Sequence, residues 1–199
     1  SYIMADLPVL YNALESYWQH FNYTYIVIFP PSSESTVMNI LAPHADEIFN
    51  IEHANLIAAK EIYADDKRTQ FFAWFNRGAN FIRLQDYASA AAAYDNAFQI
   101  YAEIDPEETN IPWRMMWYTT GPYWAYYYTG RYYDVLNLAD ITLNAISEQV
   151  LEESFYWRAM AKEALGDVDG AIADFRTALS THPDWEPALY QLNRLGATP

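Results

Sequence analysis

The sequence contains no cysteine, which excludes disulfide bonds, cysteine-ligated zinc and a thiol nucleophile. It has only six glycines, and no glycine-rich phosphate loop, dinucleotide fingerprint or nucleophile elbow occurs. No apolar run approaches the ~20 residues that a membrane-spanning helix needs. The first ten residues lack the basic start and apolar centre of a signal peptide.

Positive charge is also scarce. The 199 residues carry 11 Lys and Arg against 26 Asp and Glu, a formal net charge of −15. Such a chain would be repelled by a nucleic-acid backbone or an anionic membrane surface. We therefore expect a protein or peptide partner that is basic or neutral, and neither nucleic acid nor membrane.

Hydrophobic residues make up 52% of the chain, enough to bury a core, and their spacing indicates helical hairpins. One complete unit runs from Glu153 to Asp184 and includes Pro183. Its first helix is followed by a turn at Gly166-Asp167, and its second helix carries Ala171 and Phe175. Alanine permits close helix approach, phenylalanine fills the space between hairpins, and proline stops the helix.

Two further copies lie upstream. One places Trp74, Gly78, Phe81, Asp86-Tyr87, Ala90, Tyr94 and Ala97 at the same spacings, and a degenerate one has its turn at residues 130–132 followed by Val135, Ala139 and Thr142. The pattern resembles the tetratricopeptide repeat, whose period is about 34 residues. From Asp86 to Arg131 and from Arg131 to Asp167 the turns are 45 and 36 residues apart, so the excess should lie in loops.

The resemblance implies an all-α fold, a right-handed superhelix of helical hairpins. We expect repeats at about residues 71–104, 116–146 and 152–184, and a capping helix at 186–196. Residues 65–199 would form this repeat domain. Residues 1–64 would form a small N-terminal α/β segment, with the boundary in the charged stretch 65–69.

In the N-terminal segment, residues 7–22 have helical spacing, and residues 23–29, YTYIVIF, predict one strand closed by Pro30-Pro31. A short helix capped by the stretch Ser32–Ser35 and ended by Pro43 should follow, and then a longer helix over Asp46–Tyr63. A lone apolar strand needs a partner, so we expect it to pair with Ser1–Met4 or across a homodimer.

Residues 16–41, SYWQHFNYTYIVIFPPSSESTVMNIL, resemble the tail of the C39-like, papain-type cysteine peptidase domain that precedes tetratricopeptide repeats in some bacterial proteins. Residues 111–128 look like the unusual middle repeat of those proteins. In that family the catalytic residues lie upstream of the tail, and this chain has no Cys to match them. The resemblance implies either a fragment of a longer protein, of which this is the C-terminal accessory region, or a relative without the peptidase core. We expect the chain to be soluble, and either cytoplasmic or, if it is attached to a secreted peptidase, extracytoplasmic.

Other catalytic chemistry is not indicated. The densest set of metal-ligating residue types lacks any recognised ligand spacing and fits a solvated helix face better: His44, Asp46, Glu47, Glu52 and His53. The adjacent acidic pairs are typical of loops and helix starts. We expect no enzyme activity, no catalytic residues, no cofactor and no metal.

Aromatic residues are the most unusual feature, with seven Trp and eighteen Tyr, many of them between residues 113 and 133. One two-helix layer cannot bury them all, so several should reach a surface used for recognition. In tetratricopeptide arrays the first helices line the binding groove. By spacing, the groove would contain Asn76, Ala79, Arg83, Trp124, Tyr127, Tyr128, Tyr156, Trp157, Met160 and Arg194.

These residues favour an apolar or aromatic peptide held on Trp124 and Tyr128, with Arg83 as a polar anchor. Phe75 and Ala79 stand where a carboxylate clamp would need a basic residue and a second Asn. Three functions remain: a non-catalytic peptide-binding scaffold, an accessory region that positions a substrate or partner for a peptidase, and an enzyme. The sequence favours the first.

Overall fold

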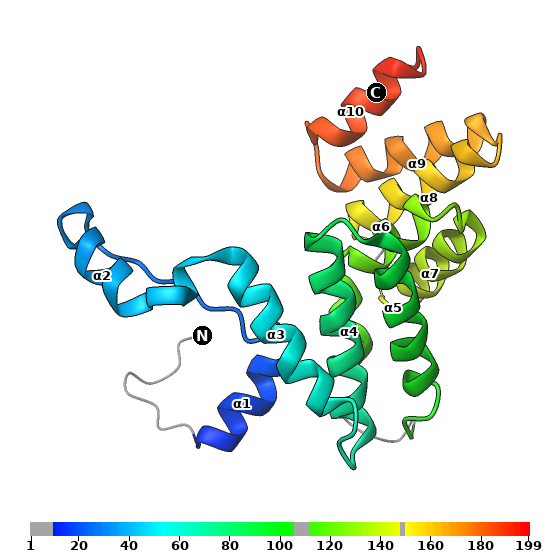
Figure 1. The fold of residues 1–199 in the computed structure, drawn as a ribbon. Coiled ribbons are helices and arrows are strands. Elements are labelled where there is room, and N and C mark those ends of the chain that lie inside the picture. Colours follow the sequence, from blue (N-terminus) through cyan, green and yellow to red (C-terminus); the bar gives the residue numbers. More distant parts are fainter. Residues whose placement is uncertain (1–9, 106–111, 148–149) are drawn as a thin grey trace. The chain divides into compact units, whose positions relative to one another are not determined.

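The computed structural model describes residues 10–105, 112–147 and 150–199 (Figure 1). Every regular element within these ranges is helical, as the all-α prediction requires. The α-helices are α1 (Tyr11–Gln19), α2 (Glu34–Leu41), α3 (Glu47–Glu61), α4 (Lys67–Arg83), α5 (Tyr87–Tyr101), α6 (Gly121–Tyr128), α7 (Tyr132–Asn144), α8 (Glu152–Ala164), α9 (Val168–Thr181) and α10 (Glu186–Arg194). Short 3₁₀ helices are η1 (Pro31–Ser33), η2 (Ala42–Ala45) and η3 (Pro112–Trp117).

The strand predicted at residues 23–29 was wrong. Residues 24–30 have no regular secondary structure, and the described ranges contain no strand. A strand forms only where a neighbouring strand accepts its backbone hydrogen bonds, and the described ranges contain no such strand beside this segment. Ile26 and Ile28 are exposed. Its expected partner Ser1–Met4 lies outside the described residues, and pairing across a homodimer remains a prediction.

The chain divides into two compact units. The first comprises residues Ser1–Asn80 with Ala93–Glu108, and the second Phe81–Ala92 with Thr109–Pro199. Helices α4 and α5 each contribute to both units, because two of the three points at which the chain passes between the units fall within these helices. The domain boundary expected in the stretch 65–69 remains a prediction.

In the first unit, α4 buries three phenylalanines against neighbouring elements. Phe75 and Tyr94 of α5 meet edge to face at 5.1 Å, and both are buried. Gly78 makes room for this contact, because a Cβ added there would lie 2.6 Å from the ring of Tyr94. This glycine therefore sets the distance between α4 and α5.

The residue after α1 also packs on α4. The ring of His20 stacks on Phe72 with the ring centroids 4.0 Å apart. Burial, and secondarily the positive charge of Arg68, lower the pKa of His20 to about 4. His20 is therefore neutral in the folded protein at neutral pH.

The predicted turns between paired helices all contain the same type of hydrogen bond. In each turn, the residue after the one with positive φ donates its backbone N–H to the carbonyl five residues earlier. This bond satisfies a carbonyl at the end of the first helix that has no partner within the helix. The positive-φ residues are Gln85 (59°), Gly130 (74°) and Gly166 (91°). The bonds run from Asp86 to Phe81, Arg131 to Tyr126 and Asp167 to Lys162, at 2.9, 2.8 and 2.9 Å.

The core of the second unit lies among α7, α8, α9 and α10. Small side chains let the helices approach closely, and Phe155 and Phe175 fill the remaining space. The buried members are Leu143, Phe155, Ala159, Ala171, Phe175, Ala178, Ala188 and Leu192. Ala188 and Leu192 belong to α10, so this helix covers the end of the α8–α9 hairpin.

Candidate functional site

Helix α6 places its aromatic residues on two faces. It begins at Gly121-Pro122, where proline is tolerated because the first turn needs no N–H donor. Tyr123 and Tyr126, three residues apart, are buried. Trp124, Tyr127 and Tyr128 follow the i, i+3, i+4 spacing of a second face. The segment therefore supplies both core and surface rings.

The second face of α6 contacts α8. The rings of Trp124 and Trp157 lie 5.1 Å apart, and those of Tyr127 and Trp157 lie 5.5 Å apart. Tyr156 meets Trp157 edge to face at 5.5 Å. Trp157 is only 6% exposed, so it supports the other rings from below.

A tyrosine from α5 extends this group. Tyr87 stacks on Tyr128, with ring centroids 4.6 Å apart and planes inclined by 25°. Trp124 remains 36% exposed and Tyr128 53% exposed. We call this group the aromatic surface; it consists of Tyr87, Trp124, Tyr127, Tyr128, Tyr156 and Trp157.

At its α10 end the aromatic surface meets a polar chain. Gln191 Nε2 donates to the Tyr156 hydroxyl at 3.3 Å, and Arg194 Nε donates to Gln191 Oε1 at 2.7 Å. Arg194 also forms an ion pair with Glu163, and this hydrogen bond raises the pKa of Arg194. Arg194 is thus near Tyr156 but already holds a carboxylate.

Burial raises the pKa of Tyr127 and of Tyr128 above the ordinary phenol value. Both side chains are therefore neutral at neutral pH. A ligand on the aromatic surface would meet uncharged ring faces together with hydroxyl groups able to donate or accept hydrogen bonds.

Of the predicted groove residues of α4, Asn76 and Ala79 belong to the first unit, and Arg83 belongs to the second unit, as does the aromatic surface. Asn76 is buried, and its Nδ2 donates to the backbone carbonyl of Gln19 at 2.8 Å. Its amide holds the end of α1 in the first unit. Ala79 is half-buried and Arg83 is exposed in the last turn of α4.

Several residues around the aromatic surface were not predicted. Tyr87 was assigned to a turn, but it is the first residue of α5. Trp185, which precedes α10, meets Tyr156 at 5.4 Å, and Glu163 pairs with Arg194. The only signal in the sequence for Trp185 was its aromatic character just after Pro183.

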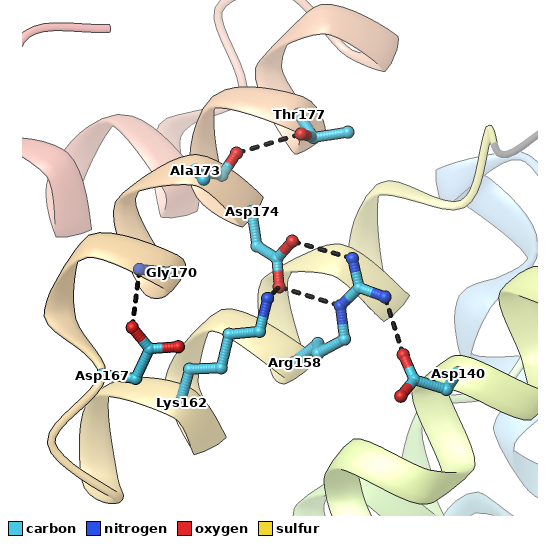
Figure 2. Close-up of polar contacts among 8 residues, drawn as sticks. All are labelled: Asp140, Arg158, Lys162, Asp167, Gly170, Ala173, Asp174 and Thr177. Carbon is cyan, nitrogen blue, oxygen red and sulfur yellow. Dashed lines mark hydrogen bonds and ion pairs between the residues drawn. The ribbon is translucent and has the colours of Figure 1, made fainter.

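A buried carboxylate anchors α8 to α9 (Figure 2). Asp174 Oδ2 and Oδ1 accept from Arg158 Nε and Nη2, each at 2.8 Å, and Oδ2 lies 2.7 Å from Lys162 Nζ. Arg158 Nη1 also reaches Asp140 of α7 at 2.7 Å. These contacts, chiefly the hydrogen bond to Asp174, raise the pKa of Arg158.

The acidic and histidine residues near η2 have structural contacts. Asp46 caps α3 by accepting from the Phe49 N–H at 2.7 Å, and His44 Nδ1 lies 3.0 Å from Asn50 Oδ1. Within the described part of the chain, no three His, Asp or Glu side chains lie close enough together to hold a metal ion. No described helix is both long and apolar enough to cross a bilayer.

A family model described as "Tetratricopeptide repeat" matches residues 153–184. Neither curated proteins nor solved structures gave a match. The family match covers α8 and α9 and agrees with the helical hairpins, so the findings support a tetratricopeptide-repeat protein. This repeat suggests a protein-interaction scaffold and is typically non-enzymatic. The resemblance of residues 16–41 to a C39-like peptidase tail is not confirmed.

Proposed function

We propose that this chain is a non-catalytic scaffold that binds a peptide segment of a partner protein on the aromatic surface. The repeat match supports protein interaction in general. The aromatic surface supports the finer proposal, because Trp and Tyr combine a large apolar area with polar edges and are enriched where proteins recognise partners.

One observation carries the proposal: Trp124 and Tyr128 remain exposed although the rings beside them are packed. The buried ring of Trp157 lies 5.1 Å from that of Trp124, and Tyr87 stacks on Tyr128, so both exposed rings are held by their neighbours. A side chain already fixed in position loses little conformational entropy when a ligand covers it. The pair therefore suits an extended peptide lying across α6 and α8.

Arg83 was predicted as a polar anchor, and Arg194 as a groove residue. Arg194 is paired with Glu163 and linked to Tyr156 through Gln191, so it would order the α10 end of the aromatic surface. Arg83 is an exposed basic residue of the second unit. We keep Arg83 as an anchor to be tested, and omit Asn76 because its amide is buried and bonded to Gln19.

The alternative function is a C-terminal accessory region of a C39-like cysteine peptidase, positioning its substrate or partner. It depends on the resemblance of residues 16–41 and of residues 111–128. No contact among the described residues favours it over the scaffold. Both functions require a partner to bind, so one experiment serves both.

The test compares wild type with Trp124→Ala/Tyr128→Ala on an array of nonapeptides with randomised sequences. We expect the double variant to lose most of the peptides that wild type retains, because both exposed rings are gone. Tyr133→Ala is the matched control, since Tyr133 is an exposed tyrosine on α7 outside the aromatic surface. Circular dichroism verifies that all three proteins are folded. Equal retention by the double variant would remove the aromatic surface as the binding site.

A further inference from the structure

We infer that the peptide held by the aromatic surface is basic, with Arg or Lys side chains placed over the rings of Trp124 and Tyr128. This inference rests on the proposed function and specifies the chemistry of its ligand. It follows from three features: the engagement of basic side chains of the second unit, the excess of acidic charge over the whole chain, and the exposure of Trp124 and Tyr128.

The first feature is that basic side chains of this unit already hold acceptors within the chain. An acidic ligand would have to displace these contacts to pair with any of the cations that make them. The pairs are Arg131 with Asp134, Arg158 with Asp140 and Asp174, Lys162 with Asp174, and Arg194 with Glu163, while Arg176 donates to the Thr198 carbonyl. Arg194 in particular, the cation beside Tyr156, is neutralised by Glu163.

The second feature is charge. A protein with a net charge of −15 repels an acidic peptide and attracts a basic one. The field of the whole chain therefore favours the approach of a basic peptide and opposes that of an acidic one.

The third feature is the rings. The face of Trp or Tyr attracts a guanidinium or ammonium group, and Trp is the strongest of the aromatic residues in this respect. Helix α6 already shows the interaction, because the guanidinium of Arg131 lies 4.3 Å from the centroid of the Tyr126 ring. Trp124 and Tyr128 on the other face of the same helix offer exposed rings to a cation from outside.

The experiment selects peptides from a phage-displayed library of random nonapeptides on wild type, Trp124→Ala/Tyr128→Ala and Tyr133→Ala. We expect the peptides that bind wild type and Tyr133→Ala but not the double variant to be enriched several-fold in Arg and Lys. A selected peptide is then synthesised with citrulline in place of each arginine. This substitution keeps the shape and removes the charge.

We expect citrulline to weaken binding on the order of ten-fold, from the loss of one or two cation–π contacts. The difference should shrink as salt rises. The inference would be overturned if the peptides whose binding requires Trp124 and Tyr128 were neutral or acidic, or if the citrulline peptide bound as well as the arginine peptide. Either result would leave the proposed function standing. If no peptide depends on Trp124 and Tyr128, both fail.

Discussion

Replacing Asp174 by asparagine should destabilise the second unit by more than any exposed charge substitution near it. The carboxylate is buried and accepts two hydrogen bonds from Arg158 as well as the ion pair with Lys162 (Figure 2). Asparagine has nearly the same shape but no charge. Two cations would then remain in the α8–α9 hairpin without their shared counter-ion.

The magnitude follows from how far water can reach these cations. Removing one partner of a fully buried ion pair costs about 3–5 kcal/mol, because the other charge stays buried and unpaired. The side chains of Arg158 and Lys162 are 20% and 25% exposed, so solvent recovers part of that loss. We expect Asp174→Asn to lower the free energy of unfolding by about 2–3 kcal/mol.

Asp140→Asn is the matched control. It removes a carboxylate from the same guanidinium at a similar distance, 2.7 Å, but the Asp140 side chain is 54% exposed. Its loss should cost at most about 1 kcal/mol.

Urea unfolding followed by circular dichroism and tryptophan fluorescence measures both variants. Thermal unfolding should show a shift of about 2–4 °C per kcal/mol for a protein of this size. If Asp174→Asn were no less stable than Asp140→Asn, the assignment of Asp174 as the anchor between α8 and α9 would be refuted.

Three further predictions concern the packing of α4 and α9 and the pH dependence of stability. Gly78→Ala should lower the free energy of unfolding by about 1–3 kcal/mol, because the new Cβ meets the buried ring of Tyr94. This loss should outweigh the better helix propensity of alanine. In urea unfolding, Tyr94→Leu should lower the free energy of unfolding by less in the Gly78→Ala variant than in wild type. Ala171→Leu should cost about 1–3 kcal/mol by overpacking, and an unchanged melting temperature would contradict the repeat register. His20 has a folded pKa of about 4, below its unfolded value, so its contribution to stability is present above pH 6.5 and is lost as the pH falls toward 4. In unfolding measured across this range, His20→Phe should show a weaker pH dependence than wild type.

The sequence predicted the hairpin of α8 and α9, because local chemistry decides its structure. Gly166 can adopt positive φ at little cost, and Asp167 caps α9 by accepting from the Gly170 N–H at 2.9 Å. Ala171 and Phe175, four residues apart, had to share the buried face of α9. Each of these is a property of a few neighbouring residues.

The strand prediction failed because a strand does not depend on neighbouring residues alone. The β-branched and aromatic residues of the run 23–29 fit a sheet, but a sheet also requires a second strand to accept its hydrogen bonds. The position of Asn76 also depends on a distant part of the chain. Its helical spacing was compatible with a groove, yet the end of α1, more than fifty residues earlier in the chain, covers it.

What the sequence by itself determined is therefore the helical class, the turns at Gly130 and Gly166, and the concentration of rings in α6. Only the tertiary structure decided which rings gather and which charges are already paired. Tyr87 lies on Tyr128, and Arg194 lies against Glu163, although 41 and 31 residues separate the partners. Helical periodicity orients a side chain on its own helix, whereas the angle and spacing at which helices pack determine which side chain it meets.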